Sequence, residues 1–170
     1  YMPVDFSQRY GVYQAVFYPE DLMYAKGTIR HIVYKNSFSS SKLEKPIRIW
    51  LGETDKQDLS EGWISTENMK EVYNGNIAFV NGINDVPVEL AEPYEYTGKN
   101  LVVVMTMDYS QGNGGYFDRF FIEQTPDKPK RTRSYMSYEP IDNSMLTEST
   151  GGLYDAMLMT RFVMNTKDAA

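Results

Sequence analysis

The sequence predicts an all-β fold, an antiparallel β-sandwich of jelly-roll type with about nine or ten strands and at most one short helix. Short segments in which apolar and polar residues alternate recur along the chain, separated by residues that favour turns. Aromatic residues make up 14% of the 170 residues, and the 14 tyrosines among them favour a half-buried pleated surface. Only residues 65–70 offer a helical start. Many short strands joined by polar turns are typical of a sandwich rather than an α/β layout.

The first half of the chain contains three predicted strands, at residues 10–18, 27–35 and 46–54. In the third strand, Ile47, Ile49 and Leu51 share one face. Arg48 and Trp50 share the opposite face. The apolar face is therefore expected to meet the core, and the other face to meet solvent or a second layer.

Turn-forming residues divide the middle of the chain. The serine-rich stretch 36–42 predicts a loop or a hairpin connection. Within a β-favouring segment at 70–80, the pair Asn74-Gly75 predicts a tight turn, because Asn-Gly tolerates φ > 0. A strand at 85–92 follows, and its Pro87 suits an edge position.

The segment 101–107 is apolar on both faces, which predicts a central strand that is covered on both sides. Later strands are predicted at 117–124, 131–138 and 155–164. The length favours one domain. We expect residues 1–165 to form a single β-sandwich module and residues 166–170 to begin a linker or tail.

The composition restricts the possible functions. The absence of cysteine excludes disulfides, thiolate zinc sites and a cysteine nucleophile. A formal net charge of −6 argues against nucleic acid as a partner, because a polyanion needs a basic surface. No run of about 18 apolar residues is present, so no membrane span is expected. The chain opens on Tyr1 without a leader, which favours a mature extracellular segment flanked by other domains of a longer protein.

The sequence contains few candidates for catalytic or metal-binding residues. His31 is the only histidine, so a Ser-His-Asp triad would need it, yet it lies in the middle of a predicted strand. A single histidine also excludes a site with two or three histidine ligands. The acidic stretch 53–61 lacks the spacing of an EF-hand loop and is interpreted as solvated. With 23 acidic residues, a pair of carboxylates for glycoside hydrolysis stays an open possibility, but no spacing in the sequence singles out such a pair.

The glycine-rich loop at 108–118 follows the predicted central strand. Its two acids, Asp108 and Asp118, are weak candidates for a bound cation such as Ca²⁺, and no other cofactor is expected. Its candidate ligand contacts are Tyr109, Asn113 and Tyr116. Exposed loops often carry binding residues, although a plain hairpin loop is the alternative interpretation.

The two tryptophans and a basic run complete the candidates. The ring of Trp50 could stack on a sugar or on a partner's cation, unless a covering loop buries it. Trp63, beside Gly62, is expected to plug a loop onto the sheet. The basic run 128–133 is interpreted as a solvated strand start, with contact to an anionic glycan or phosphate as the alternative.

Several motifs occur in a characteristic order. These are Ser7-Gln8-Arg9-Tyr10, the strand from Gly27 to Tyr34, the block from Ile47 to Phe79 with Gly62-Trp63 inside it, the turn Tyr94-Glu95-Tyr96-Thr97-Gly98 and the strand ending at Asp108. Together they resemble a β-jelly-roll, adhesin-like module that recurs in large surface and secreted proteins of gut and oral bacteria. The chain departs from that pattern by Trp50, where a tyrosine is expected, and by an insertion around residues 127–133.

The resemblance implies a non-catalytic module for adhesion or ligand recognition, with carbohydrate as one ligand class. Its partner would be a glycan or a surface protein of a host or bacterium. Fold alone does not define a function, so two alternatives stay open. One is a structural spacer or docking domain in a multidomain surface protein, and the other is a hydrolase domain.

Overall fold

The computed structural model describes residues 9–108, 118–142, 144 and 146–166. It confirms the all-β, antiparallel fold class, with ten strands and two 3-10 helices in the described part of the chain. The elements are β1 (Tyr10–Phe17), η1 (Pro19–Leu22), β2 (Gly27–Thr54), η2 (Thr66–Asn68), β3 (Lys70–Tyr96), β4 (Asn100–Asp108), β5 (Arg119–Phe120), β6 (Ile122–Gln124), β7 (Thr132–Ser137), β8 (Gly152–Tyr154), β9 (Ala156–Leu158) and β10 (Thr160–Thr166). η2 lies within the predicted helical start, whereas η1 was not expected.

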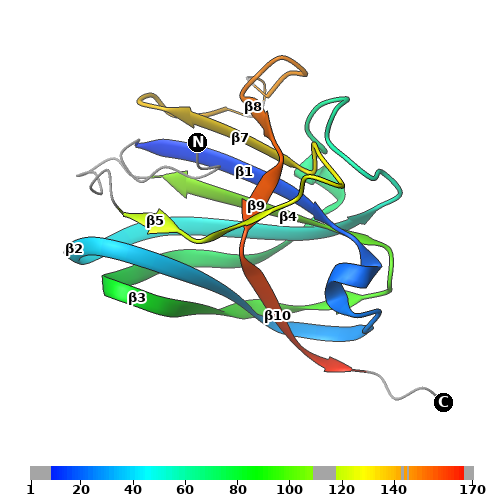
Figure 1. Ribbon diagram of the computed structural model, residues 1–170, viewed down its shortest axis with the longest axis horizontal. Helices are drawn as coiled ribbons and strands as arrows, with labels where there is room; N and C mark the ends of the chain where they lie inside the picture. Colours follow the sequence, from blue (N-terminus) through cyan, green and yellow to red (C-terminus); the bar gives the residue numbers. More distant parts are fainter. Residues whose placement is uncertain (1–8, 109–117, 143, 145, 167–170) are drawn as a thin grey trace.

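A long antiparallel ribbon, formed by β2 and β3, rolls around the molecule (Figure 1). The two strands pair along most of their length, from Gly27 with Tyr96 to Leu51 with Lys70. The register shifts between Phe38 and Lys42. The shift divides each strand into two arms, residues 27–38 and 42–54 of β2 and residues 70–80 and 82–96 of β3. The two halves of the ribbon lie in different layers of one continuous eight-stranded sheet, and these layers are called the first and the second sheet.

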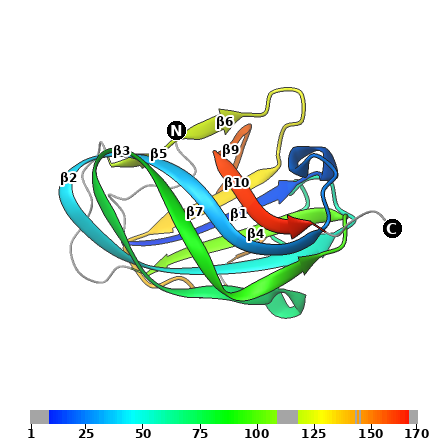
Figure 2. The same cartoon turned by 90° about the horizontal axis from the view of Figure 1, so that it is seen from below.

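Two facing layers result, and Figure 2 shows them edge-on. In the first sheet the order is the first arm of β3, the second arm of β2, β4, β1, β7 and β8. In the second sheet, the second arm of β3 pairs with the first arm of β2, which pairs with β10 and β5. The short strands β6 and β9 pair with each other.

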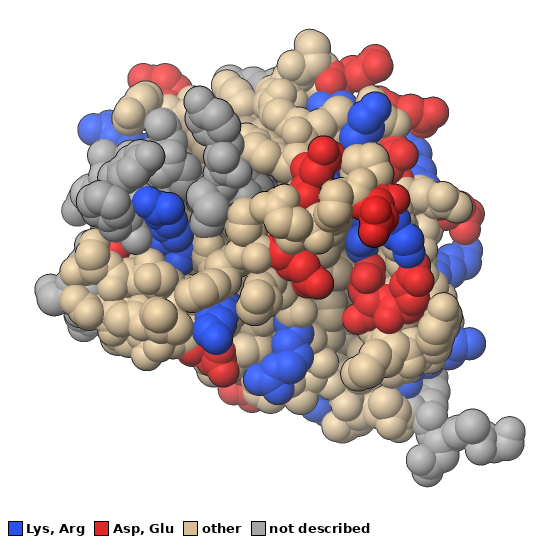
Figure 3. All heavy atoms as spheres, viewed as in Figure 1, with Lys and Arg blue, Asp and Glu red and all other residues tan. Residues whose placement is uncertain are grey.

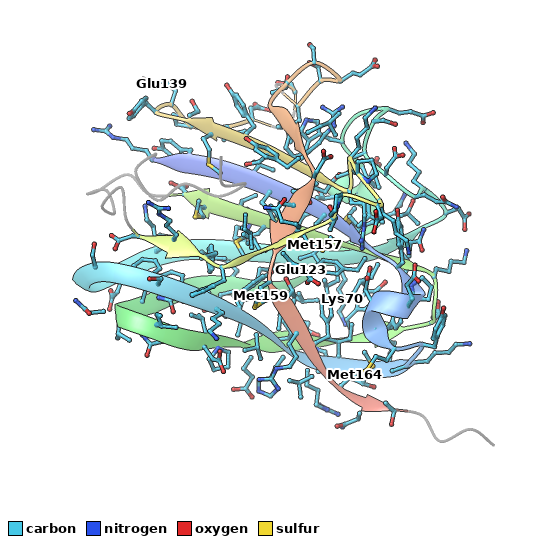
Figure 4. All side chains as sticks on the ribbon, viewed as in Figure 1. Lys70, Glu123, Glu139, Met157, Met159 and Met164 are labelled. Atoms are coloured by element: carbon cyan, nitrogen blue, oxygen red, sulfur yellow. The ribbon has the colours of Figure 1, made fainter. Side chains whose placement is uncertain are left out.

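The core lies between the layers. The backbone N–H of Leu158 donates to the hydroxyl of Tyr13 at 3.1 Å, which ties β9 to β1. Phe17 meets Phe162 edge-on with ring centroids 5.1 Å apart. Met157, on β9, also packs into this core (Figure 4). The predicted central strand is confirmed, because β4 pairs on both sides and is buried through Met105.

The serine-rich stretch 36–42 is not a loop, and the prediction there was wrong. It continues β2 without a break. Asn36 and Ser37 pair with β3 on one side and with β5 on the other. Phe38 is buried and stacks on Phe79 with ring centroids 4.8 Å apart. Pairing on both edges and burial of Phe38 outweigh the local turn preference of serine.

The Asn74-Gly75 turn was also predicted wrongly. Asn74 pairs with Arg48 and Gly75 with Ile47, inside the continuous strand β3. Gly75 has another role there, since a Cβ atom at this position would lie 3.0 Å from the hydroxyl oxygen of Tyr73. The glycine therefore leaves space for the Tyr73 ring. Pro87, by contrast, does lie in an edge strand, because β3 pairs with β2 alone among the described strands.

The basic run was expected to be solvated, and two of its arginines are buried instead. Arg131 donates through Nε to the carbonyl of Val16 at 2.9 Å, pairs with Asp21 and stacks on the Tyr18 ring. Arg133 donates through Nε to the carbonyl of Leu59 at 2.6 Å. Both guanidinium groups tie loops to the sheet, because each satisfies several carbonyl or carboxylate oxygens at once.

Candidate functional site: a groove on the outer face of the first sheet

Three neighbouring strands of the first sheet form the floor of a groove. Because side chains alternate along a strand, residues opposite the core point outward from β2, β4 and β1. Register places Trp50, Val104 and Gln14 in one row across these strands. The next row contains Arg48, Thr106 and Val12, and the last pairs Asp108 with Tyr10.

Two segments form the walls of the groove, residues 63–66 on one side and residues 140–142 on the other, and hydrogen bonds fix the first of them. The side chain of Gln14 accepts from the backbone N–H of Ile64 at 2.7 Å and donates to the Ile64 carbonyl at 2.8 Å. The indole N–H of Trp63 donates to the carbonyl of Thr150 at 3.2 Å. This bond ties the loop that carries Trp63 to the turn before β8, whereas the prediction placed that loop on the sheet, and Trp63 also lines the groove. The walls and floor enclose a hollow of about 1020 Å³.

On the floor, the Arg48 side chain stacks on the ring of Trp50. The guanidinium carbon of Arg48 lies 4.7 Å from the centroid of the Trp50 ring. The same guanidinium forms an ion pair with Glu71 on β3. Trp50 is half-buried, so the indole is fixed in place while part of it faces the groove. An aromatic ring with a fixed orientation, next to the N–H donors of a guanidinium, can contact both the apolar and the hydroxyl-bearing parts of a ligand.

Carboxylates also line the groove. Asp108 is exposed on the floor, and Asp142 is exposed on the loop that follows β7. The backbone N–H of Ser144 donates to the Asp142 carboxylate at 2.9 Å, which lowers the pKa of Asp142. Since Glu71 neutralises Arg48, the described lining has no excess of positive charge.

The structure separates the residues that the sequence singled out. Trp50 and Asp108 both line the groove. Asp118 does not: it is buried and accepts a hydrogen bond from the backbone N–H of Ser39 at 2.8 Å. The candidates Tyr109, Asn113 and Tyr116 lie outside the described residues. Within the described ranges, no three His, Asp or Glu side chains are grouped so that they could hold a metal ion.

The acidic stretch 53–61 is partly structural. Glu53 accepts hydrogen bonds from the backbone N–H groups of Thr97 and Lys99, at 3.0 and 3.2 Å, and so fixes the turn at Gly98. His31 lies on the second sheet, where it pairs with Val163 and Glu89, and so lies in the layer opposite the groove.

Sequence reasoning missed three residues of the groove, Tyr10, Gln14 and Thr106. Each is on the outward face of a strand that was correctly predicted. The signal for them was the alternation within those strands. That these residues lie close to Trp50, however, depends on the register between strands, which cannot be read from the sequence.

No protein-family model matches the chain, and no curated protein is significantly similar to it. In the described part of the chain no helix has the length and apolar character needed to cross a membrane. Acidic and basic side chains are intermingled on the face shown in Figure 3, without a continuous basic patch there.

Proposed function

We propose that this chain is a non-catalytic recognition module that binds a carbohydrate ligand in the groove on the first sheet. The observation that carries this proposal is the placement of Trp50, which is held by Arg48 on the floor of a hollow of about 1020 Å³. Binding sites of this kind are concave, with aromatic side chains and a few fixed polar groups.

The chemistry of the lining favours sugar over other small ligands. The apolar face of a sugar ring packs on an aromatic plane, while its hydroxyls exchange hydrogen bonds with polar neighbours. Trp50 and Tyr10 supply aromatic surface, and Thr106, Arg48 and Asp108 supply donors and acceptors. Both kinds of group therefore lie on one floor.

The charges of the groove support binding rather than hydrolysis. A glycoside hydrolase needs a carboxylic acid whose pKa is raised so that it can donate a proton. The hydrogen bond from Ser144 acts in the opposite direction on Asp142 and lowers its pKa. The lone histidine, His31, is in the other layer and cannot serve as a base in the groove.

The biological setting that we propose is a secreted or surface-exposed bacterial protein, in which this module attaches the whole chain to a glycan or a glycosylated surface. This part of the proposal rests on the order of the sequence motifs. Fractionation of the bacterial cells, followed by detection of the full-length gene product, tests it. Recovery of that product from the cytoplasm alone would contradict the setting without affecting the groove.

A glycan array, followed by calorimetric titration of the glycans that bind, tests the recognition function. We expect Trp50→Ala to weaken binding at least tenfold while the domain stays folded. Tyr24→Ala is the matched control, because Tyr24 is a 72% exposed aromatic residue that does not line the groove. Equal binding by the wild type and Trp50→Ala, or the absence of any glycan ligand for the folded domain, would refute the proposal.

A further inference from the structure

The two aromatic residues on the groove floor lie at opposite corners of a three-strand rectangle. Trp50 is in the row of Val104 and Gln14, and Tyr10 is in the row of Asp108. Trp50 belongs to β2 and Tyr10 to β1, with β4 between them. Any ligand that touches both aromatic side chains must therefore cross the sheet diagonally.

The length of that diagonal follows from the geometry of β-sheets. Two strand spacings separate β2 from β1, or about 10 Å, and the four residues from Gln14 to Tyr10 span about 13 Å. The Cα atoms of Trp50 and Tyr10 are thus separated by roughly 16 Å across the floor. An extended glycan advances by about one strand spacing, roughly 5 Å, for each pyranose unit. Three such steps, and hence four units, connect the two aromatic side chains.

The groups between the two corners suit a ligand without charge. Thr106 lies at the middle of the diagonal and Arg48 lies beside it on β2, where Glu71 already neutralises the charge of the guanidinium. Asp108 and Asp142 contribute negative charge to the same lining, and this disfavours an acidic sugar. Thr106, beside Arg48, offers a hydroxyl group that can both donate and accept.

We propose that the groove binds an uncharged linear oligosaccharide of about four units, with one end unit packed on Trp50 and the other on Tyr10. This inference rests on the proposed recognition function and adds the length and charge class of the ligand. Tyr10 then acts as a second stacking platform, and the units between the two platforms contact Arg48 and Thr106.

Isothermal titration with ladders of one to six units tests the inference. The probes are β-1,4-linked oligomers of glucose, mannose and xylose, with tetragalacturonate as the acidic comparison. For at least one ladder, we expect the association constant to rise at least tenfold from two to four units and less than twofold from four to six. Tetragalacturonate should bind at least tenfold more weakly than the best neutral tetramer.

Two variants of Tyr10 test its stacking role. Tyr10→Ala should lower the affinity for the tetramer at least fivefold and leave the affinity for the dimer unchanged. Tyr10→Leu retains apolar bulk in the strand without the flat ring, so it should show the same loss even if the alanine variant folds poorly. Circular dichroism of each variant establishes that the domain is folded.

Several results would overturn the inference while leaving the recognition function intact. These are a plateau at one or two units, equal binding of tetragalacturonate, and tetramer binding that is unaffected in both Tyr10 variants. Failure of all three neutral ladders to bind would also overturn it, and a positive glycan array would then still support recognition of another glycan. A negative array together with negative ladders would refute both proposals.

Discussion

The guanidinium of Arg48 lies over the indole ring of Trp50, with its central carbon 4.7 Å from the ring centroid. The two residues are separated by two positions along β2, so their side chains share the outward face of the first sheet. Glu71 on the neighbouring strand forms an ion pair with the same guanidinium. The orientation of the groove's main aromatic surface thus depends on a cation supplied by the same strand.

Replacement of Arg48 should expose more of the Trp50 ring. In a Trp63→Phe background, where Trp50 is the only tryptophan, Arg48→Ala should increase the acrylamide quenching of fluorescence at least 1.5-fold. The free energy of unfolding should fall by no more than about 1 kcal/mol, because an exposed ion pair and a surface cation–π contact are each weak. Arg161→Ala, on the exposed face of β10, is the control and should leave quenching unchanged. Identical quenching in Arg48→Ala and the control would show that Arg48 does not shield the ring.

The ion pair between Asp21 and Arg131 should matter far more than the pair between Glu71 and Arg48. The Arg131 side chain is only 4% exposed, whereas that of Arg48 is 50% exposed. Asp21→Asn would leave the buried guanidinium without its counter-charge, and we expect a loss of about 3 kcal/mol in the free energy of unfolding. Glu71→Gln is the matched change at the exposed pair and should cost less than about 1 kcal/mol.

Urea denaturation of both variants measures this difference. The asparagine keeps a side-chain oxygen that can still accept from the backbone N–H of Tyr18, so the loss reports mainly on charge. Equal losses in Asp21→Asn and Glu71→Gln would show that burial of Arg131 has no energetic effect. Such a result would also show that Asp21 does not stabilise the buried guanidinium of Arg131.

The fold class could be predicted from the sequence because the order of apolar and polar residues within each strand indicates which of its faces is buried. The segment from Leu101 to Met107 is apolar on both faces and proved to be the central strand β4. Alternation at Ile47, Ile49 and Leu51 correctly gave the core face of β2. Local preferences failed where the ribbon rolls over, because Asn36 is fully buried there and Asn36, Ser37 and Phe38 pair with β3.

The site was predicted less completely than the fold. Trp50 was singled out because a tryptophan faced away from an apolar stripe, and the structure places it on the groove floor. Tyr10 and Gln14 join it only through the pairing of β1 and β2 with β4. Neither register nor the position of the Ile64 segment follows from periodicity, since both depend on contacts between residues far apart in the chain.

Alkaline pH should destabilise the domain through its buried tyrosines. Burial, with further contributions from Glu53 and Asp21, raises the pKa of Tyr96 from its ordinary value of 10.0 to about 12. Burial also raises the pKa values of Tyr13, Tyr34 and Tyr94. Because the folded pKa of Tyr96 lies above the unfolded one, its contribution is complete below pH 10 and is lost between pH 10 and pH 12.

The melting temperature, measured from pH 8 to pH 12, checks this prediction. It should stay nearly constant to about pH 10 and then fall. Absorbance at 295 nm should show a group of tyrosines that ionise only as the domain unfolds. Tyr138→Phe, at an exposed position, is the control and should leave the profile unchanged. A melting temperature that stays constant to pH 12 would contradict the pKa shifts.

Tyr13 and Tyr34 are two fully buried tyrosines whose hydroxyl groups differ in one respect. The Tyr13 hydroxyl accepts a hydrogen bond from the backbone N–H of Leu158 at 3.1 Å, whereas the Tyr34 hydroxyl has no hydrogen-bond partner among the residues that the structure describes. Tyr13→Phe should therefore leave a buried N–H unsatisfied and lower the free energy of unfolding by about 1–3 kcal/mol. Tyr34→Phe removes a buried hydroxyl that makes no bond, so it should be neutral or stabilising by up to about 1 kcal/mol. Both variants delete the same atom from a ring in the same core, and therefore differences in packing largely cancel.

Chemical denaturation of the two variants should give opposite or clearly separated shifts in the free energy of unfolding, and amide hydrogen exchange at Leu158 should accelerate only in Tyr13→Phe. Equal destabilisation by the two substitutions would contradict this difference, because it would mean that the hydrogen bond between β9 and β1 contributes no more than the Tyr34 hydroxyl does.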